Sequence, residues 1–123
     1  MIRLCNQRNG AVLAADVEHA RTVRERLRGL LGRDALAEGR ALVIAPCTSI
    51  HTFFMRFPID VAFVDRGGRV VRGIGGLRPW RATRVYPTAA LVVELPAGTL
   101  ARTGTAEGDR LAFEPAAAGE NPV

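Results

Sequence analysis

From Gly39 onward the chain alternates short apolar runs with turns that contain glycine or proline, and this alternation limits the fold more than any other feature. The runs that we predict to be strands cover residues 41–45, 49–55, 59–65, 70–74, 89–95 and 110–113. Short strands that recur at roughly 8 to 12 residues are typical of β-sandwiches and barrels. We therefore predict a mainly β domain, built as a small sandwich or barrel.

The N-terminal residues predict a hairpin. Two apolar-rich runs, 2–5 and 12–17, lie on either side of Asn9 and Gly10. The dipeptide Asn-Gly is a strong signal for a tight turn, because both residues tolerate the positive φ that such a turn requires. We therefore expect the two runs to be paired antiparallel strands.

One short amphipathic helix is predicted to begin at Thr22. Thr22 and Glu25 have the spacing of a capping box, in which each side chain accepts a hydrogen bond from the other residue's backbone N–H. Apolar residues then follow Val23 at helical spacing, as far as Leu31. Gly32 is placed to end the helix in a left-handed conformation. Such a helix is long enough to cover one patch of a sheet.

Length and composition fit a single domain. The chain has 123 residues, of which 48% are hydrophobic and 24% are charged. We expect the domain to cover 1–113, and the Ala-, Pro- and Gly-rich residues 114–123 to form a flexible tail. The apolar runs are far shorter than the roughly 20 residues that a membrane-spanning helix needs, so we expect no membrane association.

The N-terminus and the cysteines predict a cytoplasmic location. Residues 1–10 contain no apolar stretch of the length that a signal peptide requires. Two cysteines, Cys5 and Cys47, are too few for a disulfide framework in a chain of this length. We therefore expect reduced thiols. A single bridge between the two remains an open alternative.

The charge is basic and unevenly distributed. The formal net charge is +5, every basic residue is an arginine, and 66–84 contains six arginines and no acid. Trp80 and Tyr86 lie in or beside this stretch, and the alternation of basic and aromatic residues suits single-stranded nucleic acid. The alternative is a solvated loop, 75–87, whose Trp80 folds back onto the sandwich.

His51 is the first candidate for chemistry. Cys47 precedes it by four residues and Asp60 follows, which invites a metal site or a Cys/His nucleophile. The alternative is a half-buried histidine bonded to a backbone carbonyl, with Cys47 as a small core residue. On a regular strand Asp60 reaches the His51 face only if an even number of residues connects the two strands. A three-residue connection sends Asp60 to the opposite face.

Two further carboxyl groups stand beside or within apolar strands. Asp60 either accepts backbone hydrogen bonds from the turn 56–59 or acts as a ligand acceptor or general base. Glu94 interrupts the apolar run 91–95 on the face of Val92. It is either paired with an arginine or buried with a raised pKa, poised as an acid.

Four ordered motifs resemble one family. The stretch CTSIHTFFMRFPID, 47–60, followed by VAFVD, resembles the signature of DUF192, also called UPF0127. Thr22 to Leu30, VELPAG at 93–98 and Gly108-Asp109 resemble further motifs of that family in the same order. The resemblance extends from about residue 12 to 113 and implies a small, jelly-roll-like β-sandwich. The family has no assigned activity.

Signatures of the common enzyme classes are missing from the sequence, including the nucleophile elbow, the P-loop and the dinucleotide fingerprint. We therefore expect a non-enzymatic accessory or binding domain for an anionic small ligand or a protein partner, without cofactor or metal, as a monomer or weak homodimer. Arg56, Trp80, Arg81 and His51 are predicted to contact the ligand. One alternative is a hydrolase-like or metal-dependent enzyme that uses His51 and Asp60, with Glu94 as a third candidate. The other is a nucleic-acid binder, which we do not favour.

Overall fold

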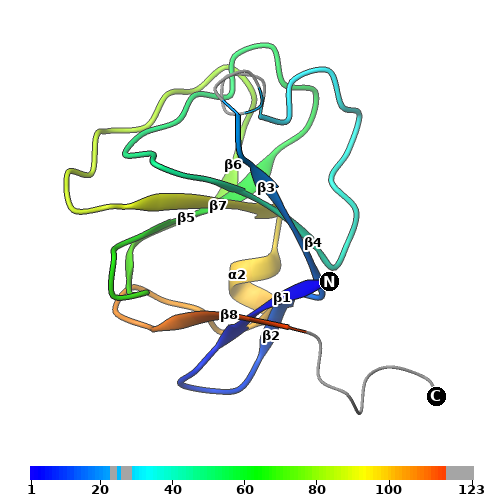
Figure 1. Ribbon diagram of the computed structural model, residues 1–123. Coiled ribbons are helices and arrows are strands. Elements are labelled where there is room, and N and C mark those ends of the chain that lie inside the picture. The colour runs from blue at the N-terminus through cyan, green and yellow to red at the C-terminus, as the bar shows by residue number, and fades with distance from the viewer. Residues whose placement is uncertain (23–24, 26–28, 116–123) are drawn as a thin grey trace.

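The computed structural model describes residues 1–22, 25 and 29–115 (Figure 1). Within them, eight strands form two sheets, and one short helix follows the seventh strand. The elements are β1 (Ile2–Asn6), β2 (Val12–Ala14), β3 (Asp16–Ala20), β4 (Arg40–Ile44), β5 (Ile59–Val64), β6 (Val70–Leu77), β7 (Leu91–Pro96), α2 (Thr99–Arg102) and β8 (Leu111–Pro115). The strand orders are β2-β1-β8 and β3-β4-β7-β5-β6. The predicted mainly β class is confirmed, and the two sheets have a sandwich-like arrangement.

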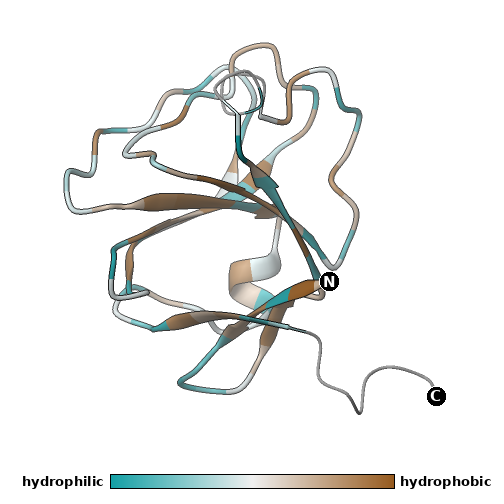
Figure 2. Ribbon diagram, in the orientation of Figure 1, coloured by the Kyte–Doolittle hydropathy of each residue, from teal (hydrophilic) through white to brown (hydrophobic). Residues whose placement is uncertain are grey.

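The five-stranded sheet buries side chains on both of its faces. Its inner face lies toward the three-stranded sheet and α2 (Figure 1), and carries Val43 and Val93 among its core residues. Its outer face carries Leu42 and Val92 and is covered by loops. Apolar residues follow the strands, whereas hydrophilic residues occupy many of the turns (Figure 2). All six residues of β5 are buried, as expected for a strand covered on both sides.

The predicted N-terminal hairpin is confirmed, but its second strand is shorter than expected. β1 and β2 pair antiparallel, and Gly10 in the turn has a φ of 73°. The run 12–17 does not form one strand, because the chain leaves the first sheet at Ala15. The backbone N–H groups of Ala15 and Asp16 both donate to the carbonyl of Gly39, over 2.8 and 3.0 Å. The chain then continues as β3 in the other sheet.

The predicted helix falls largely outside the described residues. Its capping box is present: the N–H of Thr22 donates to Glu25 Oε1, and the N–H of Glu25 donates to Thr22 Oγ1, each over 3.0 Å. Val23 and Leu27 of the predicted apolar stripe lie among the residues that are not described. Gly32 is left-handed as predicted, with a φ of 82°.

The prediction of a strand over 49–55 is wrong. This segment belongs to the loop 45–58, and its one strand-like pairing is an isolated bridge between His51 and Ala82. Phe54 has a φ of 66°, which is incompatible with an extended strand. Apolar alternation alone did not reveal that the partner of this segment is another loop.

Two strand ends and one helix also differ from the predictions. β6 extends to Leu77, so the loop that follows it begins later than expected and covers 78–90, and β8 extends to Pro115, into the predicted tail. Residues 116–123 lie outside the described part. Helix α2 was not predicted, because Gly98 at its N-cap provides no side-chain hydrogen bond. No helix in the described residues has the length and apolar character needed to cross a membrane.

Candidate functional site

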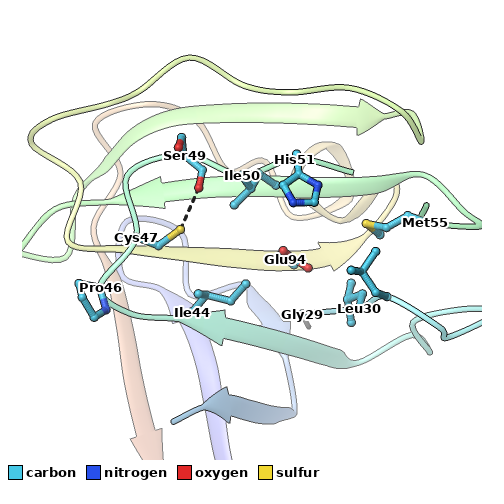
Figure 3. A pocket seen from close by; sticks show the side chains of 11 residues that line it. Gly29, Leu30, Ile44, Pro46, Cys47, Ser49, Ile50, His51, Met55 and Glu94 are labelled. Carbon is cyan, nitrogen blue, oxygen red and sulfur yellow. Dashed lines mark hydrogen bonds between the residues drawn. The ribbon is translucent and has the colours of Figure 1, made fainter. Parts of the chain in front are cut away.

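A pocket of about 310 Å³ lies on the outer face of the five-stranded sheet. Glu94 of β7 forms its floor, the loop 45–58 supplies most of its roof, and residues 29–31 close another side (Figure 3). The lining residues are Gly29, Leu30, Leu31, Ile44, Pro46, Cys47, Ser49, Ile50, His51, Met55 and Glu94. Most of them are apolar, so the pocket suits a small and largely apolar molecule.

Glu94 is an isolated acidic group among apolar neighbours. It pairs across the sheet with Leu42 of β4 and Val61 of β5, both of which belong to the core of the outer face. The residue is only 4% exposed, and its Oε2 atom has no hydrogen-bond partner among the described residues. A buried polar atom without a partner costs free energy. A hydrogen-bond donor that reached this oxygen would offset that cost.

Burial raises the pKa of Glu94 to about 7, because apolar surroundings disfavour the charged carboxylate. The positive charge of Arg33 acts in the opposite direction. The Arg33 guanidinium is itself bound to Glu18, with 2.7 Å between Nη2 and Oε2. Within the described residues, the predicted arginine ion pair of Glu94 is therefore absent. The structure agrees with the other alternative, a buried carboxyl with a raised pKa.

Cys47 and His51 line the same pocket from its roof. The thiol of Cys47 donates to the carbonyl of Ser49 over 3.0 Å, and burial raises its pKa. A protonated thiol is a poor nucleophile, and Cys47 packs against the outer-face core as the structural alternative predicted. His51 is exposed, and its Nδ1 accepts a hydrogen bond from the N–H of Phe53 over 3.3 Å. The predicted half-buried histidine bonded to a carbonyl is therefore wrong. Cys5 and Cys47 are both free thiols.

The roof is held in place by hydrogen bonds between the loops 45–58 and 78–90. The side chain of Thr52 is fully buried. Its N–H donates to the carbonyl of Arg81 over 2.7 Å, and its hydroxyl donates to the carbonyl of Arg78 over 2.6 Å. The N–H of Arg81 donates back to Thr52 Oγ1 over 2.9 Å. One buried threonine thus joins two loops that contain no regular strand.

Three exposed aromatic side chains, Phe53, Phe54 and Trp80, form a cluster that we call the aromatic rim. The ring centroids of Phe54 and Trp80 are 4.6 Å apart, and Phe53 stacks on the pocket residue His51 at 5.0 Å. Trp80 is 56% exposed, so the predicted folding of this side chain onto the sandwich is wrong. Phe54 and Trp80 have φ values of 66° and 65°, a conformation that is strained for aromatic residues.

Asp60 binds backbone groups. Its carboxylate accepts hydrogen bonds from the N–H groups of Gly76, Gly98 and Leu100, over 2.8, 3.1 and 2.8 Å. Two of these donors lie at the start of α2, so a side chain from β5 caps this helix from a distance. The structural role predicted for Asp60 therefore agrees with the structure, although the donors are not those of the turn 56–59.

The sheet separates Asp60 from His51. Asp60 pairs with Leu95, a core residue of the inner face, whereas His51 lies in the roof over the outer face. A catalytic pair of His51 and Asp60 is therefore incompatible with this arrangement. In the part of the chain that the structure describes, no three His, Cys, Asp or Glu side chains gather where they could hold a metal ion.

The arginines predicted to contact a ligand lie outside the pocket. Arg56 donates to Asp34 Oδ1 over 2.6 Å, in an exposed ion pair. The Nη1 of Arg81 donates to the carbonyl of Trp80 over 3.4 Å. Of the four predicted contact residues, His51 lines the pocket and Trp80 belongs to the aromatic rim next to it.

The basic stretch 66–84 is distributed over β6 and two loops. Arg72 forms an ion pair with Glu107 over 3.2 Å, and Arg69 donates to the carbonyl of Gly108 over 3.1 Å. The other four arginines, which are also exposed, are Arg66, Arg78, Arg81 and Arg84. Two of the six arginines in this stretch therefore bind residues 107 and 108 of the same chain.

Sequence reasoning missed the apolar walls of the pocket. Leu30, Ile44, Ile50 and Met55 line it, yet in the sequence they resemble ordinary core residues. Apolar periodicity shows which side of an element is apolar. It does not show whether that side packs against other residues or lines a pocket. The detectable signal was the single charge of Glu94 within an apolar strand.

The fold and the pocket define a small two-sheet β domain with a buried carboxyl group at the floor of an apolar pocket. The DUF192 family (uncharacterized ACR) matches residues 4–113. UPF0127 proteins of Thermococcus sibiricus and Thermococcus gammatolerans are 31% and 32% identical over 115 and 116 residues, each match covering 90% of this chain and 74% of the relative. A crystal structure of a Novosphingobium aromaticivorans protein of unknown function superimposes with a TM-score of 0.77 at 23% identity, over 90% of this chain and 82% of that one. The chain belongs to the DUF192 family, and the resemblance found in its sequence is confirmed.

Proposed function

We propose that this domain binds a small organic molecule in the Glu94 pocket. The observation that carries the proposal is that Glu94 lines the pocket and that its Oε2 atom is buried without a hydrogen-bond partner among the described residues. Binding sites for small molecules are typically concave and apolar, with a few polar groups that orient the ligand. The Glu94 pocket has this composition.

The position of the pocket supports the same function. Its floor belongs to β7, which is hydrogen-bonded to β4 and β5, and its roof is fixed through Thr52. A site whose walls are fixed before binding loses less conformational entropy when the ligand enters. The pocket is therefore organised for binding without a large rearrangement of the described elements.

Ligand-observed saturation-transfer NMR with a library of cationic, neutral and anionic fragments tests this function. Ser49→Trp places a large ring in the pocket lining and should abolish the transfer to pocket ligands. Ala82→Trp is the matched control, because Ala82 is exposed, bridges to His51 and does not line the pocket. Fragments that bind the wild type and Ala82→Trp but not Ser49→Trp support the proposal. Equal transfer in the two variants, or none in the wild type, contradicts it.

An acid–base enzyme is a second candidate, with Glu94 and His51 in place of the predicted pair of His51 and Asp60. The observation in its favour is that both side chains line one pocket and that the pKa of Glu94 is raised to about 7, the range in which a general acid works best. Chemical conversion of a pocket ligand by the wild type, and its loss in Glu94→Gln with binding retained, would identify an enzyme. Unchanged ligand recovered from the wild type favours the binding domain.

Nucleic-acid binding by the stretch 66–84 stays a prediction. The aromatic rim, with Arg78 and Arg81 next to Trp80 in the chain, is the feature that favours it. Affinity for a single-stranded oligonucleotide should fall steeply with salt if phosphate contacts dominate. An affinity that hardly changes with salt argues against this function.

A further inference from the structure

We infer that the Glu94 pocket selects an organic ammonium ion, an amine with a short apolar tail, and that the Glu94 carboxylate is its counter-ion. This inference rests on the proposed function and names the class of ligand. It replaces the anionic ligand that the sequence suggested, because the arginines of that prediction lie outside the pocket.

The charges around the pocket support a cationic ligand. Glu94 is the one acidic residue in the described lining, and no arginine belongs to that lining. Among the described residues, the basic group that acts on Glu94 is Arg33, whose guanidinium is already bound to Glu18 over 2.7 Å. A buried carboxylate is costly unless a positive or hydrogen-bonding group compensates it. Because the described residues provide no donor to Oε2, a ligand ammonium group is the partner that compensates the charge best.

Other head groups fit the lining less well. A carboxylate ligand would place a second negative charge beside Glu94, and two adjacent carboxylates cannot both ionise without a cation. An alcohol could donate one hydrogen bond to Oε2, but would leave the charge uncompensated once Glu94 ionises. The Cys47 thiol already donates to the carbonyl of Ser49, so it is not free to stabilise an anion.

The apolar walls and the entrance agree with an alkylammonium ion. Leu30, Ile44, Ile50 and Met55 surround the space above Glu94 and would bury the tail (Figure 3). At the edge of the pocket, His51 stacks on Phe53, which contacts Trp80 at a centroid distance of 6.2 Å. The faces of aromatic rings attract cations. The aromatic rim therefore favours the approach of an ammonium ion to the pocket.

Three probes with the same six-carbon chain separate the head groups: hexylamine, hexan-1-ol and hexanoate. Their affinities are measured by isothermal titration calorimetry at mildly alkaline pH with wild type, Glu94→Gln and Glu38→Gln. Hexylamine should bind the wild type at least about tenfold more tightly than hexanol, the ratio expected for one charge-assisted hydrogen bond. Glu94→Gln should remove this preference. Glu38→Gln should keep it, because Glu38 is exposed and lies outside the pocket.

A second measurement needs no substitution of Glu94. Near neutral pH, an ammonium ion that pairs with Glu94 should displace the carboxyl proton, so the binding enthalpy should vary with the ionisation enthalpy of the buffer. Among the described residues, the other titratable or charged groups that line the pocket or act on the carboxyl are Cys47, His51 and Arg33. His51→Gln should release the same fraction of a proton as the wild type. Release that disappears in His51→Gln would assign the proton to histidine and overturn the inference.

The outcomes distinguish this inference from the proposed function. Tighter binding of hexanol or hexanoate overturns the ammonium ligand and leaves a binding pocket. If Ser49→Trp blocks the binding of fragments but hexylamine does not bind, the ammonium ligand is likewise overturned and the binding pocket is retained. The absence of every pocket ligand in the fragment experiment contradicts the proposed function itself.

Discussion

The Glu94 carboxyl should make the stability of the protein depend on pH in a way that the variant Glu94→Gln removes. Glutamine keeps the shape of the side chain and cannot ionise. The pKa of Glu94 is about 7 in the folded protein. In the unfolded chain the side chain is exposed, and its pKa has the ordinary glutamate value of 4.5. The folded state therefore binds this proton more tightly than the unfolded state.

The sign of the effect follows from this difference. The stabilising contribution of the protonated carboxyl is fully present below about pH 4.5, declines as the pH rises, and is lost once the pH passes about 7. The interval between the two pKa values corresponds to about 3 kcal/mol of unfolding free energy. Glu94→Gln should be insensitive to this titration, so its stability relative to wild type should increase by about that amount over the interval.

Urea unfolding followed by circular dichroism, from about pH 5 to about pH 8, measures this difference. Exposed Glu38 provides the control variant Glu38→Gln, whose profile should run parallel to that of the wild type. Acidic groups with lowered pKa values, such as Asp109, titrate below this range and do not interfere. If Glu94→Gln and wild type also give parallel profiles, Glu94 does not titrate as a buried, unpaired carboxyl and the reasoning about the pocket floor is wrong.

Three other substitutions have defined outcomes. Asp60→Asn turns an amide NH₂ toward backbone N–H donors and should lower the free energy of unfolding by about 2 kcal/mol. The affinity for hexylamine, measured by calorimetry, should stay unchanged. A weaker affinity would instead indicate that Asp60 acts at the ligand site. Hydrogen bonds from Arg8, chiefly, and from the N–H of Ala106 hold the pKa of Asp109 well below its usual range. Its contribution is present above about pH 4 and lost in stronger acid, so acid unfolding of Asp109→Asn should show a shallower loss than wild type. Thr52→Val should lower the free energy of unfolding in urea by about 1 to 3 kcal/mol and should lower the fluorescence anisotropy of the single tryptophan. Unchanged anisotropy would show that other contacts hold the roof.

Local features of the fold were predictable. The hairpin at Asn9 and Gly10 and the capping box of Thr22 and Glu25 depend on neighbouring residues, and both are present. The strand β5 was predicted because five of its six residues are apolar and Asp60 is the one exception. These elements depend on turn chemistry and side-chain pattern, which a sequence displays directly.

Features that depend on distant partners were not predictable. The backbone of the segment 49–55 bonds to another loop, so its strand-like composition was misleading. Helix α2 is capped by Asp60, which accepts a hydrogen bond from the N–H of Leu100 and lies 40 residues before it in the chain. No local capping signature therefore marked this helix in the sequence. The two alternatives for Glu94 depend on which arginine approaches it in the fold, and among the described residues Arg33 is bound to Glu18 instead. In each case the deciding interaction joins residues that are far apart in the chain.

The pairing of β1 with β8 has a consequence for the synthesis of the protein on the ribosome. β1 is the central strand of its sheet, bonded to β2 on one side and to β8 on the other. The hairpin of β1 and β2 emerges early, but the second edge of β1 stays open until residues 111–115 have left the exit tunnel. Leu111 of β8 also belongs to the core between the two sheets. Nascent chains therefore expose an unpaired strand edge and an incomplete core for most of translation, and this is the interval in which a chaperone would protect the protein from aggregation.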